Sequence, residues 1–222
     1  MKRIAPVLVA VVLLLGFVHT SVGAWDRHPH VLDIDTGRGV LDVIGQVNNL
    51  PATADSPLGS SQQFGYVSHL DGVASVFADS SPAQNESSAL LTFFTDVKTT
   101  GLTVNGPLTV IIREGTTTFY RNSAPASFSS PDSFQSGEPV TASTIRQQVI
   151  VDSVERTFTV VNVNTLTETK FFELGDGVVR IGSRGDVIRT SLMGVLKVRD
   201  GSAPPPTGYF AGSGAGVSRH QN

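Results

Sequence analysis

The chain has 222 residues, with 16 Lys and Arg against 19 Asp and Glu, and it contains no cysteine. The formal net charge is −3, and the sequence has no cluster of basic residues that could bind the phosphates of a nucleic acid. The lack of cysteine excludes disulfides, thiolate metal sites and cysteine nucleophiles.

Residues 1–24 are typical of a secretory signal peptide. Two basic residues precede an apolar run from Ile4 to Val18, and small residues surround a cleavage point after Ala24. The run is shorter than the roughly 20 apolar residues that a comfortable spanning helix needs. We therefore expect a mature chain that begins at Trp25, has no membrane span and is secreted to the extracellular space or the periplasm.

The following part of the chain, residues 25–199, predicts a single antiparallel β-domain. It is rich in Val, Thr, Ser, Phe and Gly, and short apolar or alternating runs replace any 3.6-residue periodicity. The predicted strands are Val31–Asp35, Val40–Val47, Gln63–Leu70, Val73–Ala78, Ala89–Val97, Pro107–Glu114, Thr116–Arg121, Thr144–Val151, Thr157–Thr165, Thr169–Leu174, Gly177–Ile181 and Val187–Val198. Roughly 8–12 short strands at this spacing indicate an all-β sandwich or barrel.

Some of these segments predict more than a strand. Asp71-Gly72 indicates a two-residue hairpin turn between two strands. Residues 89–97 are apolar on both sides, which predicts a central strand covered on each face. In Val187–Val198 the apolar residues alternate with polar ones, as in a strand with one wet face. Residues 200–222, rich in Pro and Gly, are expected to form a disordered tail.

The stretch HPHVLDIDTG offers a candidate metal site. His28 and His30 lie on one side of an extended chain, and Asp33 and Asp35 could add oxygen ligands of the kind that zinc or copper accepts. A site needs three or four ligands that are held in place, and the remaining histidines give no spacing that completes one. The sequence therefore favours an exposed histidine pair and no bound metal.

The same stretch contains Asp35-Thr36-Gly37, which superficially resembles the catalytic tripeptide of aspartic proteases. Those enzymes need two carboxylates that share a proton, and in so short a chain the second would come from another subunit. Only ten residues separate Asp35 from the proposed cleavage point, which leaves no room for the preceding hairpins. The favoured interpretation is a strand that runs into a turn.

Glu114 and His69 are the candidate acid/base residues. Alternation places Val110, Ile112 and Glu114 on one face of a strand, so Glu114 would point inward, with a raised pKa, if that face is the core face. The alternative is that Glu114 begins a turn and reaches water. His69, which we place on the same face as Val67, is either an acid/base residue or a structural one, and the sequence favours the structural role.

The sequence favours a secreted, non-enzymatic β-domain that acts by binding or as an envelope or extracellular structural component. Its partner would be a protein, a glycan or an apolar small molecule. The segment Asn122–Ala142 is the surface to test, because Phe128 and Phe134 lie there among Ser, Pro and Asp. The alternative for these two rings is that they cover the mouth of a barrel.

The rival function is a small-molecule-binding β-barrel, including a cofactor-independent isomerase or cyclase. Phe93, Val110 and Ile112 would then line the interior, with Glu114 as the acid or base. We expect no cofactor, because the chain has no dinucleotide fingerprint and no phosphate-binding glycine loop. The sequence leaves the ligand and the oligomeric state open.

Overall fold

A computed structural model describes residues 30–32, 39–78, 83–175, 177–197 and 207–217. The strands are β1 (His30–Leu32), β2 (Gly39–Leu50), β3 (Ser60–Leu70), β4 (Leu91–Asn105), β5 (Leu108–Arg121), β6 (Glu138–Asp152), β7 (Thr157–Thr169), β8 (Phe172–Leu174), β9 (Gly177–Ile181), β10 (Val187–Leu196) and β11 (Thr207–Val217). One short 3₁₀ helix, η1 (Pro131–Gln135), completes the elements of the described ranges. The fold is therefore all-β, as the sequence predicts.

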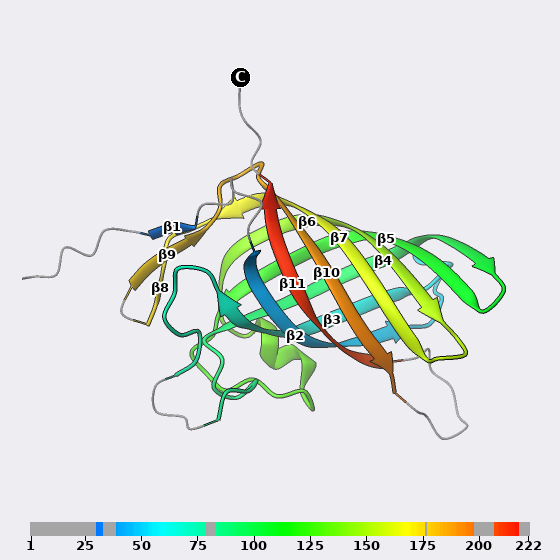
Figure 1. Cartoon of the computed structure of the whole chain (residues 1–222), viewed down its shortest axis with the longest axis horizontal. Coiled ribbons are helices and arrows are strands. Elements are labelled where there is room, and N and C mark those ends of the chain that lie inside the picture. The colour runs from blue at the N-terminus through cyan, green and yellow to red at the C-terminus, as the bar shows by residue number, and fades with distance from the viewer. Residues whose placement is uncertain (1–29, 33–38, 79–82, 176, 198–206, 218–222) are drawn as a thin grey trace, which may run out of the picture.

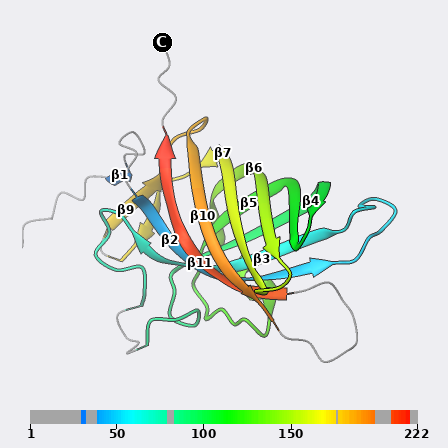
Figure 2. The same ribbon diagram turned by 45° about the vertical axis from the view of Figure 1, so that its right-hand side comes forward.

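Eight strands form a closed antiparallel barrel in the order β10-β11-β2-β3-β4-β5-β6-β7. Each strand pairs with its neighbours in this order, and pairing of β10 with β7 closes the ring. Figures 1 and 2 show β2, β11, β10 and β7 side by side along one wall. The sequence left a sandwich and a barrel open, and the structure decides for the barrel. A small separate sheet has the order β1-β9-β8, with β1 parallel to β9.

The two ends of the barrel differ. One end, called here the hairpin end, carries the connections β2–β3, β4–β5 and β6–β7 (Figure 1, right). The β4–β5 turn is tight because Gly106 adopts a φ of +59°, which L side chains rarely tolerate. The opposite end, the loop end, carries the small sheet and the long connections β3–β4 and β5–β6. The two ends therefore carry different segments of the chain.

The part of the wall formed by β3 and β4 is covered on both faces. Residues 91–95 are all buried, and the β5–β6 connection with η1 lies against their outer face (Figure 1). The ring of Phe134 lies 5.4 Å from that of Phe64 and 5.0 Å from that of Phe128, measured between centroids. Thr92 Oγ1 donates a hydrogen bond of 2.8 Å to the carbonyl oxygen of Phe134. This confirms that residues 89–97 contain a strand covered on each face.

The predicted tail, residues 200–222, is wrong for its central part. Residues 207–217 form β11, a barrel strand with two hydrogen-bonded neighbours, so the β-domain does not end at 199. The glycines at 208, 212 and 214 do not signal disorder, because each lies where a side chain would come too close to neighbouring atoms of the barrel. A Cβ on Gly208 would lie 2.7 Å from the Phe158 ring. The other residues of that tail lie outside the described ranges.

Other boundaries also differ from the prediction. The two strands expected on either side of Gly115 are one continuous strand, β5, and the strand expected at 73–78 is replaced by an irregular segment with one isolated bridge from Phe77 to Ala89. The chain does turn at Gly72, where φ is +73°, but no hairpin follows. The alternation predicted for Val187–Val198 is confirmed in the first part of β10, since Ile188 and Leu192 are buried and the residues between them alternate in exposure, whereas Val198 lies outside the described residues.

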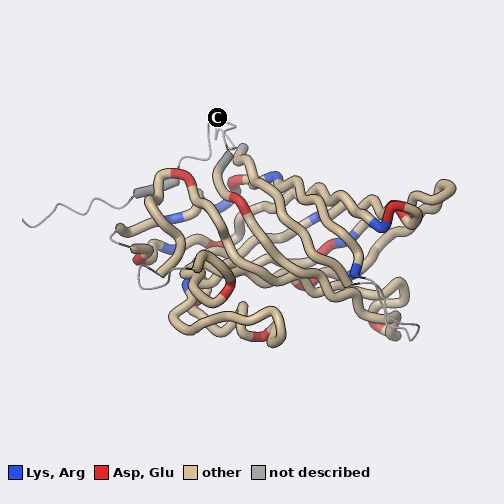
Figure 3. Tube along the Cα trace, turned by 60° about the horizontal axis from the view of Figure 1, so that its bottom comes forward, with Lys and Arg blue, Asp and Glu red and all other residues tan. Residues whose placement is uncertain are grey.

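The proposed signal peptide lies outside the described residues and stays a prediction. No helix in the described ranges has the length and apolar character to cross a membrane. Figure 3 shows Lys and Arg dispersed along the described trace and interspersed with Asp and Glu.

Candidate functional site

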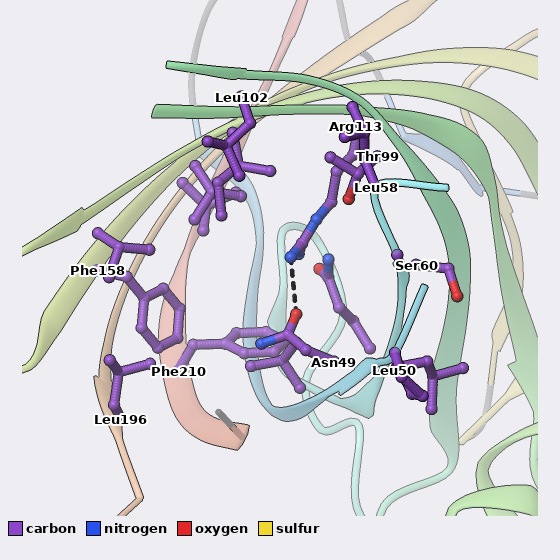
Figure 4. Close-up of a pocket in the computed structure, with 18 of the residues that line it drawn as sticks. Asn49, Leu50, Leu58, Ser60, Thr99, Leu102, Arg113, Phe158, Leu196 and Phe210 are labelled. Carbon is purple, nitrogen blue, oxygen red and sulfur yellow. Dashed lines mark hydrogen bonds between the residues drawn. The ribbon is translucent and has the colours of Figure 1, made fainter. Parts of the chain in front are cut away.

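The barrel contains a cavity that opens at the hairpin end (Figure 4). The cavity volume is about 240 Å³. An eight-stranded barrel is wide enough either to be filled by side chains or to hold one small ligand, and the side chains of this barrel leave the hairpin end open. The apolar walls include Val47, Val149, Phe158, Val160, Leu192 and Phe210.

The walls follow from period-two alternation in the strands. Along β6, Ile145, Gln147 and Val149 are buried, whereas Arg146 and Gln148 are exposed. The buried set points into the barrel because successive Cβ atoms of a strand point to opposite faces. Every other residue of β6 therefore contributes to the interior, and the neighbouring strands contribute in register.

The floor of the cavity is a partition of side chains. Gln63, Leu192 and Phe210 line both this cavity and a smaller one of about 40 Å³ that lies deeper in the barrel. The Phe210 ring is held by an interior aromatic contact, 6.3 Å from the centroid of Phe93. The accessible space thus has apolar walls, a partly polar floor and an open mouth.

Amide side chains form a hydrogen-bonded network at this floor. Gln63 and Gln147 donate to each other at 2.9 and 3.1 Å, and Gln147 Nε2 also donates to Asn162 Oδ1 at 3.0 Å. Asn162 Nδ2 in turn donates to Thr190 Oγ1 at 2.8 Å. These groups are buried, and their hydrogen bonds with one another offset the cost of removing them from water.

Arg113 is the most unusual residue of the cavity. It is only 6 % exposed, and no other charged side chain within the described ranges is buried. Figure 4 shows it reaching from β5 across the cavity to Asn49, and Nη2 donates to Asn49 Oδ1 at 2.7 Å. Burial lowers the pKa of Arg113 to about 10, so the guanidinium still carries its charge at neutral pH.

The expectation that Val110, Ile112 and Glu114 line the interior is wrong. They pair in register with residues of the exposed side of β6, and Glu114 itself is exposed opposite Arg146. The alternating positions, which include Arg113, face inward instead. The alternation of this strand was interpreted correctly, but the wrong side was assigned to the core, because the inward side contains a charged residue. Glu114 does not begin a turn either, since β5 continues through it.

His69 and Phe93 have opposite outcomes. Phe93 is buried in the barrel interior, where its ring lies 6.0 Å from that of Phe119, and it lines the deeper cavity. His69 is exposed and does not share the face of Val67. The register shifts between these two residues, so that Ser68 is an extra residue in β3 and reverses the side that His69 faces.

The two rings of the β5–β6 connection neither form an exposed contact surface nor cover the barrel mouth. Phe134 is fully buried and Phe128 is partly buried, and both pack on Phe64 against the outer wall of β3. Phe64 lies on this outer side because it pairs with Gln46, whereas the inward Gln63 pairs with Val47. The aromatic residues of this connection therefore contribute to stability.

The candidate metal ligands cannot be placed as a set. Of these four residues, only the backbone of His30 is described, in β1, and His28, Asp33 and Asp35 lie outside the described residues. The remainder of the described chain contains no group of three or more His, Asp or Glu side chains arranged to hold a metal ion.

Sequence reasoning missed both Arg113 and Gln147. A usable signal existed for Gln147, which shares the strand face of Ile145 and Val149, since a lone amide among apolar residues on one face indicates a buried polar contact. No equivalent signal existed for Arg113, because an arginine in an alternating strand normally marks the wet face.

Comparison of the chain with protein-family models, with curated proteins and with solved structures finds no match.

Proposed function

We propose that this protein binds a small apolar molecule inside its barrel and acts as a secreted, non-enzymatic binding protein. The observation that carries the proposal is the open, apolar-walled cavity of about 240 Å³ at the hairpin end. Transfer of an apolar ligand from water into such a site is favourable in proportion to the surface removed from water. Secretion is part of the proposal because residues 1–24 have the pattern of a signal peptide.

A cofactor-independent isomerase or cyclase would use the same cavity. The only ionisable side chain among the described residues that line it is Arg113, and burial lowers the pKa of this group only to about 10. A general acid or base works best when its pKa lies near the operating pH. The lining therefore favours binding of a ligand over proton transfer to it.

The test uses the neutral fluorescent probe N-phenyl-1-naphthylamine together with two matched variants. Val149 lines the cavity, whereas the next residue, Ile150, lies on the outer face and is 38 % exposed. We expect Val149→Phe to fill the cavity and weaken probe binding by about tenfold or more, and Ile150→Phe to leave it within about twofold. Circular dichroism confirms that both variants are folded.

Native mass spectrometry of protein purified from its own host provides a second, independent measurement. A retained apolar molecule in the wild type, absent from Val149→Phe, supports the proposal. The proposal is wrong if the folded wild type neither binds the probe nor retains a ligand, or if the two phenylalanine variants bind the probe equally.

A further inference from the structure

The barrel buries a positive charge that no carboxylate of the described chain neutralises. The buried side chains of the described ranges include Arg113 but no Asp or Glu, and desolvation alone accounts for its lowered pKa. Removal of an unpaired charge from water is costly. This cost is a reason to expect a negatively charged group that the described residues do not supply.

The hydrogen bonds of Arg113 leave donors available. Nη2 donates to Asn49 at 2.7 Å, Nη1 donates to Gln147 over a long 3.5 Å, and Nε is buried with no acceptor among the described residues. A guanidinium has five N–H donors in a planar fork. Arg113 therefore has both charge and hydrogen-bonding capacity in reserve.

The amide network does not depend on Arg113. Gln147 Oε1, which accepts the long bond from Arg113, also accepts from Gln63 Nε2 at 2.9 Å, and Gln147 is fixed from its other side by Asn162. The network would thus keep its shape if the guanidinium turned toward a ligand. Arg113 adds charge to the cavity without being needed to satisfy its polar floor.

The surroundings of Arg113 fix the orientation that a ligand would have. Arg113 pairs with Gln147 in the β5–β6 register, and the cavity-lining residues of these two strands between this level and the hairpin end are Ile111, Val149 and Val151, all apolar. Along β5 and β6, a bound molecule would therefore contact the guanidinium at its inner end and apolar side chains from there to the mouth.

We propose that Arg113 binds the carboxylate of an apolar carboxylic acid, which enters the barrel with its carboxylate deepest and its hydrocarbon part toward the mouth. The planar guanidinium matches a carboxylate through two parallel hydrogen bonds. A single cation neutralises one negative charge, whereas a phosphate dianion would leave a second charge buried. This inference rests on the proposed function, and it adds the chemical class of the ligand.

The experiment compares two probes of equal chain length, palmitate and hexadecanol, by displacement of N-phenyl-1-naphthylamine. We expect the wild type to bind palmitate at least about tenfold more tightly than hexadecanol, as a charge-assisted hydrogen-bonded pair implies. Arg113→Gln should lose this preference, so that its affinities for palmitate and for hexadecanol lie within about threefold of each other. Arg113→Lys, which keeps the charge without the planar fork, should keep only part of it.

A second measurement, the pKa of the bound ligand, tests the inference on the wild type itself. In a carbon-13 NMR titration of carboxyl-labelled palmitate bound to the wild type, the pKa of the carboxyl should lie below that of palmitate free in detergent micelles, because the guanidinium favours the ionised form. A carboxyl pKa raised by burial would overturn the inference. The same titration with Arg113→Gln should show such a raised pKa.

The outcomes separate the two proposals. If the folded wild type binds neither palmitate nor hexadecanol nor the fluorescent probe, the proposed function fails and the inference fails with it. If the wild type binds both probes equally, or if Arg113→Gln keeps the preference for palmitate, the cavity is an apolar binding site and the role of Arg113 is overturned.

Discussion

Gln63 and Gln147 exchange two hydrogen bonds across the barrel interior, with Nε2 of each side chain donating to Oε1 of the other at 2.9 and 3.1 Å. They belong to β3 and β6, strands that are not neighbours in the barrel. The pair therefore ties separate parts of the wall together and gives the cavity a floor, above which an apolar ligand would lie.

The effects of removing Gln63 and Gln147 on stability should not be additive. Gln147→Leu leaves Gln63 and Asn162 with buried unsatisfied groups, so we expect a decrease of about 2–4 kcal/mol in the free energy of unfolding, measured in urea. The double variant with Gln63→Leu should lose clearly less than the sum of the two single losses. Additive losses would show that the pair is not coupled. The exposed neighbour provides the control, since Gln148→Leu should change stability by less than about 0.5 kcal/mol.

Arg113 should reduce the stability of the ligand-free protein. Arg113→Met removes an unpaired buried charge and keeps an unbranched chain, so the free energy of unfolding at pH 7 should rise by about 1–3 kcal/mol. Urea unfolding without ligand measures this difference. If the free energy of unfolding of the variant is unchanged or lower than that of the wild type, Asn49 and Gln147 already compensate the charge.

Gly208 should not tolerate a side chain. An added Cβ would lie 2.7 Å from the Phe158 ring and 2.7 Å from the carbonyl oxygen of Val195, a backbone atom that cannot move aside. We expect Gly208→Ala to destabilise the barrel by about 1–3 kcal/mol in a urea titration. Ser213→Ala, at an exposed position of the same strand, is the control and should have little effect. Equal effects would contradict the assignment of Gly208 to a close contact.

Phe134 should matter for stability and not for binding. Its ring is fully buried on the outer side of the wall, so Phe134→Ala should lower the free energy of unfolding by about 3–5 kcal/mol. Binding of N-phenyl-1-naphthylamine, measured below the unfolding transition, should stay within about twofold because the cavity lies on the other side of β3 and β4. The exposed Gln135, changed to Ala, serves as the control. A selective loss of binding would show that η1 contributes to the ligand site.

Stability should fall as the pH rises above about 10, in part through Tyr66. Burial, and secondarily the negative charge of Glu86, raise the pKa of Tyr66 above its ordinary value of 10.0. The unfolded chain therefore loses this proton at a lower pH than the folded chain, and the contribution of Tyr66 is present below pH 10 and lost as the pH rises through its folded pKa. Tyr66→Phe should show a shallower fall than the wild type as the pH rises above about 10, as urea midpoints would measure. An identical pH profile would contradict the shift.

Much of the fold was predictable because it depends on local patterns. Alternation identified most strand positions, and the double apolar face of residues 89–97 correctly indicated a strand covered on both sides. The glycines at positions 72, 106 and 175 lie at turns of the chain and have positive φ. These features involve neighbours along the chain, so the sequence carries them directly.

The candidate site was much less predictable. Alternation states which residues of β5 share a face, but it cannot state which face is inside when the inward side carries Arg113 and the outward side carries Val110 and Ile112. A single-residue bulge at Ser68 reversed His69 in the same way. In both cases the side that a residue faces depends on pairing with a neighbouring strand, and the local sequence does not identify that strand.

The sequence by itself therefore determined an all-β chain with antiparallel strands and a set of inward and outward positions within each strand. Only the tertiary structure decided that the strands close into a barrel, because closure requires β11 to pair with β2, and its Gly-rich sequence has no local signal strong enough to announce a strand. Closure also creates the cavity and places Arg113 in it. The physical reason is that burial of a charge, and the space left beside it, are properties of side chains brought together from several strands, and no single strand contains them.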